Sequence, residues 1–285
     1  MDRSQSPENL PHRRAFVLFL VLKIMYDQGR GFLDTAYQRA EYLDCLAAEP
    51  HTKDEIESAL GDSRSTVDRA IRELEHWELV HRTVDTYELT LAGVLVLDEI
   101  HRLRSRFRSL SKSAPALRAM PTTAGLVGSV FEAATVTLPG DDVVRGPVDE
   151  HSRLLDRATS VRTIGSVVLP QLIETYHRRI VTDGMTADVV VSAPVVERLV
   201  SGYPDRVVEG LRTNRCQIRQ ISHEYSFGSV IANTPAGPRL GVLLYGDTEI
   251  IGFIETSAAP AIRWAESRFD RVWAAATPIG ETISQ

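Results

Sequence analysis

The stretch TKDEIESALGDSRSTVDRAIRELEHWELV, residues 52–80, decides the fold of the N-terminal half. Thr52, with Glu55 three residues later, is the pattern of a capping box, and Gly61 ends the helix that this box begins. One of the two residues after Gly61 caps a second helix, since both Asp and Ser are favoured at that position. The apolar residues of this second helix recur every three or four positions, so the sequence predicts one buried face: Val67, Ala70, Ile71 and Leu74.

Other helices and a hairpin surround this stretch. Residues 37–49 have helical spacing, the segments LVHRT and YELTL alternate as a hairpin around residues 84–86, and a further helix begins near Leu91. The order of these elements from Tyr37 to about Leu110 resembles the winged helix-turn-helix of many archaeal and bacterial regulators. That resemblance implies that the second helix of the motif, which carries the stripe from Val67 to Leu74, enters the major groove of double-stranded DNA with its N-terminal part.

The face of this helix opposite its apolar stripe supplies the predicted DNA contacts. Ser65 and Thr66 place short hydroxyl groups near the helix N-terminus, where backbone N–H groups and a partial positive charge favour a phosphate. Arg69 has the reach and the paired N–H groups to read guanine, a contact worth about 1–3 kcal/mol. Arg64 and Arg72 are predicted to contact phosphates.

A purely structural interpretation of the same residues is also open. Serines and threonines before a helix often serve only as caps, and arginines at helical spacing often form a solvated face. Asp68 lies four residues from both Arg64 and Arg72, so we expect it to hold those two side chains in place. The elements before and after the helix favour the DNA-binding interpretation.

Further positive charge lies in the hairpin and in the helix after it. Arg82 in the hairpin is another candidate phosphate contact, and five basic residues follow in residues 101–113: Arg102, Arg104, Arg106, Arg108 and Lys112. This segment is either a basic flank beside DNA, a dimer helix, or a solvated linker helix. Residues 37–110 hold ten Lys and Arg against fifteen Asp and Glu, so we expect DNA binding to be weak at other sites and steeply dependent on salt.

Composition limits the class of protein. A chain of 285 residues with 43% hydrophobic and 25% charged residues fits a globular protein of about two domains. The net charge of −6 excludes general binding to nucleic acid or to membrane surfaces. Only Cys45 and Cys216 occur, without metal-ligand spacing, so we expect reduced thiols in a cytoplasmic protein, with no disulfide framework and no metal site.

The first 36 residues form an N-terminal extension. The apolar run AFVLFLVLKI, residues 15–24, is shorter than the roughly 20 residues that span a bilayer, so no membrane segment is predicted. Arg13 and Arg14 resemble part of a twin-arginine export signal, but no cleavage site of small residues follows. The extension is interpreted either as a helix that packs on the protein or as the product of a start assigned too early, with Met25 as the true start.

The pattern changes after a proline-containing linker at residues 111–123. Strand-like VRTIGSVVL is followed by a helix, a buried strand TADVVVS and two further helices, and then by four strands in succession. Strands that first alternate with helices and then follow one another predict an α/β domain with a mixed sheet over residues 124–279, before a short tail at 280–285.

This half resembles the sensor domain of the archaeal methanogenesis (filament-formation) regulators. The residues that carry the resemblance are IGSVVLPQLIE, LGVLLYGDTEIIGFIETS and AIRWAESRFDRVW. It implies a regulatory domain that follows a winged helix, and it assigns no ligand to any position. Polar residues near strand ends are candidate contacts of a small-molecule effector, because ligands of α/β sheets bind there: Ser166, Ser192, His223 and Tyr225.

A catalytic role is the alternative for this domain. His177 with Arg178, Arg179 and Asp183 resembles the histidine-lysine-aspartate motif of phospholipase D-like enzymes, but arginine replaces the lysine, the acid comes one position early and there is no second copy. No nucleotide-binding or hydrolase motif occurs, so neither an enzyme nor a cofactor is predicted.

The sequence therefore predicts an α+β winged helix-turn-helix domain at residues 37–110 joined to a C-terminal α/β domain. The predicted function is a cytoplasmic, effector-controlled transcription regulator that binds double-stranded DNA, as a homodimer because such motifs bind paired half-sites. A winged helix that binds another protein is the remaining alternative, and the arginines on the outer face of its second helix argue against it.

Overall fold

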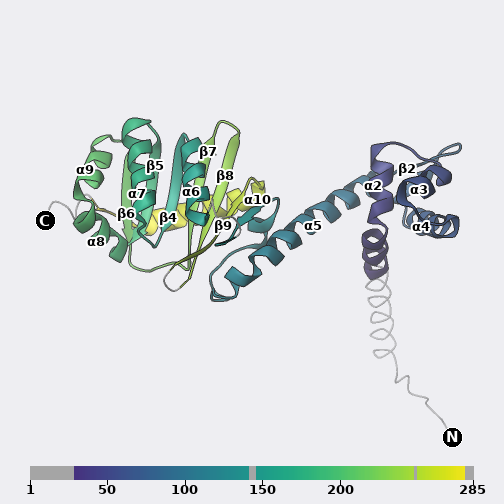
Figure 1. Cartoon of the computed structure of the whole chain (residues 1–285), viewed down its shortest axis with the longest axis horizontal. Helices are drawn as coiled ribbons and strands as arrows, with labels where there is room; N and C mark the ends of the chain where they lie inside the picture. The colour runs from purple at the N-terminus through teal and green to yellow at the C-terminus, as the bar shows by residue number, and fades with distance from the viewer. Residues whose placement is uncertain (1–28, 141–145, 247–248, 280–285) are drawn as a thin grey trace, which may run out of the picture. The chain divides into compact units, whose positions relative to one another are not determined.

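The chain divides into two compact units, Met1–His101 and Arg102–Gln285 (Figure 1). The structure, a computed structural model, describes residues 29–140, 146–246 and 249–279. Most of the predicted N-terminal extension and the predicted tail lie outside these residues, and residues 29–38 are helical.

The first unit contains the predicted order of elements. In chain order these are three helices, a hairpin and the start of a long helix: α2 (Ala40–Ala48), α3 (Lys53–Leu60), α4 (Arg64–His76), β1 (Val80–Arg82), β2 (Tyr87–Leu89) and α5 (Leu91–Leu117). Strands β1 and β2 are antiparallel, and His51 adds a bridge to Tyr87 through two backbone hydrogen bonds of 3.1 and 2.8 Å. Helix α5 extends through residue 117 and so includes the first part of the predicted linker.

The ends of α3 and α4 follow from their capping residues. The Thr52 hydroxyl accepts a hydrogen bond from the Glu55 backbone N–H at 3.3 Å, and the Glu55 carboxylate accepts one from the Thr52 N–H at 2.7 Å, so the predicted capping box is confirmed. Gly61 ends α3 with a φ of 71°, a left-handed conformation that glycine adopts at little cost. Ser63 caps α4, while Asp62 accepts a hydrogen bond from the Tyr42 hydroxyl.

The core of this unit joins all its elements. The predicted stripe of α4 is fully buried, whereas Ala47 of α2 and Ala59 of α3 are exposed. Thr90 fixes the junction of hairpin and α5: its hydroxyl donates to the Glu78 carbonyl at 2.6 Å and accepts from the Gly93 N–H at 3.0 Å. Gly93 packs so closely that a Cβ there would overlap with the Leu79 carbonyl oxygen.

The second unit is built on one mixed sheet of eight strands. Its strands are β3 (Thr135–Thr137), β4 (Ser160–Gly165), β5 (Thr186–Ser192), β6 (Cys216–Ile221), β7 (Phe227–Thr234), β8 (Gly237–Tyr245), β9 (Ile250–Thr256) and β10 (Thr277–Pro278). Their order is β10-β6-β5-β4-β7-β8-β9-β3, with β4, β5 and β6 parallel and all other neighbours antiparallel. The predicted α/β domain with a mixed sheet is confirmed.

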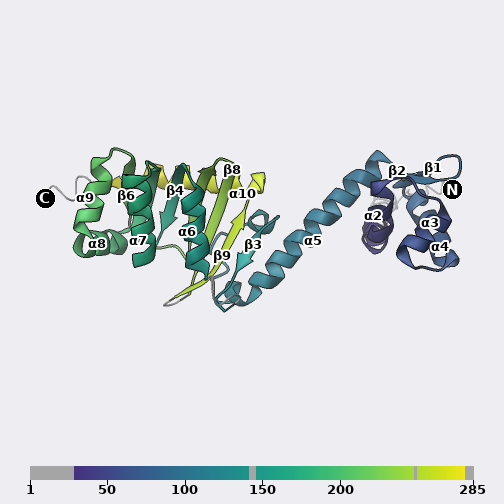
Figure 2. The same ribbon diagram turned by 45° about the horizontal axis from the view of Figure 1, so that its top comes forward.

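Helices cover both faces of this sheet (Figures 1 and 2). They are α6 (Pro147–Arg157), α7 (Pro170–His177), α8 (Ala193–Gly202), α9 (Pro204–Arg212) and α10 (Ala259–Ala275), with one turn of 3₁₀ helix at Gly128–Phe131 and a π-helical turn at Arg178–Thr182. Helix α10 packs on one face around Ile164 and Phe269, whereas α6 and α7 pack on the other around Leu154 and Leu243. Successive strand residues point to opposite faces, which separates the two cores.

Candidate functional site

The outer face of α4 is open to solvent. Arg64, Ser65, Arg69 and Arg72 are exposed, and Thr66 is half-buried. The Ser63 hydroxyl lies 3.0 Å from that of Ser65 and 2.8 Å from that of Thr66, so one cap groups three hydroxyls at the helix N-terminus. The structure thus brings five of the six predicted DNA contacts onto one helix.

The arginines of this face differ in their partners. Arg64 donates from Nη1 to the Asp54 carboxylate at 3.1 Å, in a pair whose two side chains are 69% and 76% exposed. Arg72 donates from Nε to the backbone carbonyl of Asp68 at 3.0 Å. The Arg69 side chain makes no hydrogen bond or ion pair with any residue that the structure describes. An exposed pair contributes less than about 1 kcal/mol, so all three guanidinium groups remain available to an anion.

The expectation that the Asp68 carboxylate holds Arg64 and Arg72 is wrong. Its Oδ1 accepts from Lys53 Nζ at 2.7 Å, and the lysine nitrogen also lies 5.4 Å from the centre of the Tyr87 ring. The hydrogen bond from Lys53 lowers the pKa of Asp68, and the same bond raises the pKa of Lys53. Lysine prefers this compact pair because its single nitrogen fits between the carboxylate and the ring, which leaves the arginines pointing outward.

Arg82 lies apart from α4, on the hairpin. It is exposed on β1, and its side chain makes no hydrogen bond or ion pair among the described residues. The hairpin tip ends in Val84, whose side chain is 87% exposed.

Part of the basic segment at residues 101–113 has a structural role in the second unit. Arg106 donates to the Glu132 carboxylate at 2.6 Å, and Ser109 donates to the Ala134 carbonyl at 3.1 Å. Arg108 is exposed. These contacts favour the linker-helix interpretation for Arg106 and leave Arg108 as a candidate surface charge.

Three of the four predicted ligand contacts lie together beyond the ends of the parallel strands. The Tyr225 N–H donates to the Ser166 hydroxyl at 2.9 Å, and the rings of His223 and Tyr225 pack edge to face at 4.6 Å. Arg268 of α10 stacks on Tyr225 at 4.4 Å. Ser192 is fully buried, and its hydroxyl has no partner within the described part of the chain.

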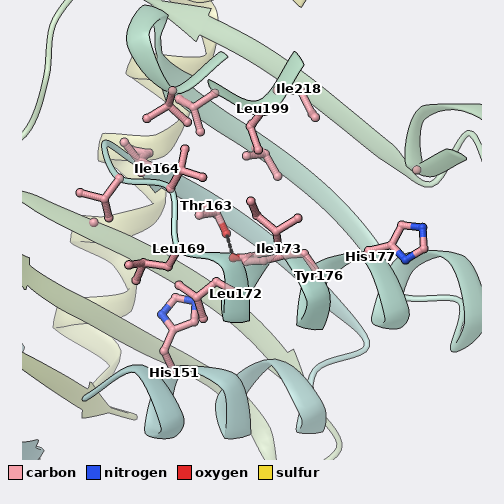
Figure 3. A pocket seen from close by; sticks show the side chains of 18 of the residues that line it. His151, Thr163, Ile164, Leu169, Leu172, Ile173, Tyr176, His177, Leu199 and Ile218 are labelled. Atoms are coloured by element: carbon pink, nitrogen blue, oxygen red, sulfur yellow. Dashed lines mark hydrogen bonds between the residues drawn. The ribbon is translucent and has the colours of Figure 1, made fainter. Parts of the chain in front are cut away.

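A separate cavity of about 150 Å³ lies between the sheet and helices α6 to α9 (Figure 3). Most of its wall is aliphatic, including Ile164, Leu169, Leu172, Val189 and Ile218. Val189 and Ile218 belong to two central strands but are only half-buried, because their side chains face the cavity. None of the four predicted ligand contacts lines this cavity.

Most polar groups in the wall of this cavity are uncharged. The Thr163 and Tyr176 hydroxyls are 2.8 Å apart and share a hydrogen bond in the cavity wall (Figure 3). Burial raises the pKa of the Cys216 thiol to about 12 and that of the Tyr245 phenol to about 12, so both stay protonated. Arg206 of the wall forms an ion pair with Glu174, and His177 Nε2 lies 2.7 Å from the Glu209 carboxylate.

His151 of α6 is the polar residue of the cavity without a partner. Its side chain is buried, and neither Nδ1 nor Nε2 has a hydrogen-bond partner among the described residues. Burial lowers its pKa to about 4, so the imidazole is neutral at neutral pH. The sequence carries a signal for this residue, because Leu154 and Leu155 follow it at helical spacing and place it on the buried face of an amphipathic helix.

The residues of the phospholipase D-like alternative are engaged with neighbouring side chains and backbone. His177 Nε2 lies 2.7 Å from the Glu209 carboxylate, and Asp183 accepts from Arg178 at 2.8 Å and from Arg179 at 3.0 Å. In the described ranges, no three His, Cys, Asp or Glu side chains gather as they would around a metal ion. The helices of those ranges include none with the length and apolar character needed to cross a membrane.

Two family models match the chain. Residues 144–275 match the methanogenesis regulatory protein FilR1, middle domain, and residues 27–111 match the HVO_A0261 N-terminal domain. The predicted resemblance to the archaeal methanogenesis regulators is therefore confirmed. No curated protein matches the chain.

The solved structures that are similar to the chain match it with low sequence identity and low TM-scores. TrmBL2, an archaeal chromatin protein, is 12% identical with a TM-score of 0.36, over 82% of this chain and 90% of that one. ZitR of Lactococcus lactis is 23% identical with a TM-score of 0.23, over 30% and 63% of the two chains. Nuc, a phospholipase D family member from Salmonella typhimurium, is 10% identical with a TM-score of 0.39, over 51% and 96%. We transfer no function from them.

Proposed function

We propose that this chain is a sequence-specific, DNA-binding transcription regulator whose first unit is a winged helix-turn-helix. The observation that carries the proposal is the outer face of α4, where exposed Arg69 has no partner in the described part of the chain and three hydroxyls gather at the helix N-terminus. A helix with this face fits the major groove, with Arg69 reading a base and Arg64, Arg72 and Arg82 contacting phosphates. The match of residues 144–275 to a domain of a regulatory protein supports it.

The second unit is proposed to control this activity by binding a small-molecule effector, in the cytoplasm. A ligand that binds one state of the protein more tightly than another shifts the population between them. Ser166, His223 and Tyr225 remain predicted contacts, although Ser166 is already engaged by the Tyr225 backbone.

A mobility-shift assay on the whole chain tests DNA binding. A duplex is first selected for binding from random sequences, and the Arg64→Ala/Arg69→Ala variant is then expected to lose specific binding at least a hundredfold, because it removes one base contact and one phosphate contact. Arg215→Ala/Arg263→Ala removes the same charge from exposed positions of the second unit and should bind as the parent does. Equal binding by the two double variants would contradict the proposal.

We also propose that the regulator is a homodimer, since winged helices bind paired half-sites. In the first unit α5 exposes three apolar side chains, Leu91 at 76%, Val94 at 43% and Leu95 at 57%. Pairing with a second copy would remove this surface from water. Light scattering of the Leu91→Glu/Leu95→Glu variant should give the mass of one chain where the parent gives two, and a dimer of unchanged mass would exclude this surface.

A further inference from the structure

The cavity on the α6–α9 side of the sheet contains an unsatisfied hydrogen-bonding group. His151 is 4% exposed, and both of its ring nitrogens lack a partner among the described residues. Leaving such a group unpaired in the protein interior costs about 1–3 kcal/mol. The centres of the Tyr176 and Phe253 rings lie 6.3 and 5.7 Å from the centre of the imidazole, and neither ring forms a hydrogen bond with it.

The side chains around His151 restrict what can satisfy it. The Tyr176 hydroxyl shares a hydrogen bond with Thr163, and Leu169 and Leu172 line the same cavity as the imidazole (Figure 3). A neutral imidazole offers one donor and one acceptor, so it can bond a hydroxyl, a carbonyl or an amide. Most of the remaining wall is aliphatic and suits apolar surface.

Size and charge restrict the ligand further. A cavity of about 150 Å³ holds a molecule near the size of benzene. Arg206 at its wall is paired with Glu174, whose carboxylate would repel a bound carboxylate or phosphate, so a neutral ligand fits the described wall better than an anion. Burying an unpaired anion there would be far more costly than burying a neutral group.

We propose that this cavity binds a small, neutral, mainly apolar molecule, and that His151 recognises the single hydrogen-bonding group that the molecule carries. As an account of the effector, this inference rests on the function proposed above; as a binding site, it stands independently of DNA binding. The cavity wall comes from strands β4 to β8, from helices α6 to α9 and from the π-helical turn, so it joins both parallel and antiparallel strands of the sheet.

Calorimetric titration of the whole chain without DNA tests this site with three probes of similar shape: phenol, toluene and benzoate. Phenol and toluene should both saturate one site per chain, with phenol bound about fivefold more tightly because only phenol can bond to His151. Benzoate should not bind measurably. Saturable binding of benzoate as tight as that of phenol, or no binding of phenol and toluene, would overturn the proposal.

Three variants locate the binding. His151→Leu keeps an apolar wall and should bind toluene as before while losing the preference for phenol. His101→Leu is the control, because its imidazole is paired with Asp44 and is not part of the cavity wall, and it should keep that preference. Val189→Phe fills the cavity from β5 and should abolish binding of both probes with an unfolding temperature no lower than that of the parent; binding that survives in it would place the probes elsewhere.

The DNA assay separates the two proposals. If the protein binds its selected duplex in the mobility-shift assay but binds none of the three probes, the cavity site is refuted and the DNA-binding proposal is retained. If the protein binds phenol but no DNA, the DNA-binding proposal is refuted and the cavity site is retained.

Discussion

The outer face of α4 and the cavity of the second unit are opposite kinds of site. The α4 face is exposed and charged, and its residues lie within about two and a half turns of a single helix. The cavity is lined mostly by apolar side chains, and its wall comes from strands β4 to β8, helices α6 to α9 and the π-helical turn. A surface site on a helix can therefore be predicted from the sequence, because its residues are those outside the buried stripe of that helix. An interior site depends on how segments far apart in the sequence pack together.

The two regions also differ in how their side chains affect the stability of the fold. Individual contacts on the α4 face, such as the pair of Arg64 with Asp54, contribute little to folding and are free to change partner. In the cavity His151 is held in place by packing and lacks a hydrogen-bond partner among the described residues, which opposes folding. Changes to the two regions should therefore act on different observables, DNA affinity for the first and stability or ligand binding for the second.

The largest effect is expected from Gly93→Ala in the first unit. A methyl group at this position would overlap with the backbone carbonyl of Leu79, which can move only if the hairpin leaves α5. We expect a loss of about 3 kcal/mol in the free energy of unfolding of the first unit, measured by chemical denaturation, and a parallel loss of DNA binding.

Gly210→Ala is the control for this substitution. Gly210 is also a buried helical glycine, but a Cβ there meets nothing within 4 Å, so alanine should be neutral or slightly stabilising. If Gly93→Ala and Gly210→Ala had the same effect, the close junction of hairpin and α5 would not be a determinant of the first unit.

A pH-dependent loss of stability is expected from His151. Its pKa is about 4 in the folded protein and 6.5 in an unconstrained chain, so between these values the unfolded state binds a proton that the folded state does not. Stability should therefore be complete above pH 6.5 and should fall, by up to about 3 kcal/mol, as the pH drops towards 4. Scanning calorimetry at several pH values measures it for the second unit.

The His151→Leu variant isolates this contribution from other titrating groups. Its stability should decline less than that of the parent over the same range, because its unfolded state has lost the proton-binding group. Parallel declines in the two proteins would mean that His151 is not held neutral in a closed cavity.

The smallest effect is expected from Asp54→Asn on the α4 face. The substitution releases Arg64 and removes one negative charge near the proposed DNA, so DNA affinity should rise about threefold at low salt and less at high salt. Stability should change by less than about 0.5 kcal/mol. Asp205→Asn makes the same charge change at an exposed position in the second unit and should leave affinity unaltered in a mobility-shift titration.

Much of the first unit was predictable because its determinants are local. Thr52 with Glu55, Gly61 and the apolar stripe of α4 each act within four residues of chain, and all three were confirmed. The partner of Asp68 was not predictable in this way. Lys53 reaches it from the preceding helix, a contact set by the packing of α3 on α4 rather than by spacing along α4.

In the second unit the class of fold was predictable and the cavity was not. The succession of strands and helices was enough to predict the mixed sheet. The same sequence placed candidate ligand contacts at strand ends, where Ser166 turned out to bond the Tyr225 backbone. A space between α6, α7, α8, α9 and the sheet depends on side-chain volumes from all of them, which no local pattern reports.

The central claim is that the N-terminal part of α4 lies against the duplex, and chemical cleavage from a tethered reagent tests it most directly. Ser65→Cys in a Cys45→Ser background offers one exposed thiol on α4, since Cys216 is buried, and Arg263→Cys offers one in the second unit. With a DNA-cleaving reagent on the thiol, the Ser65→Cys protein should cut its selected duplex at a few adjacent bases within the bound site, and the Arg263→Cys protein should not. A Ser65→Cys protein that binds the duplex and leaves those bases uncut would contradict the account.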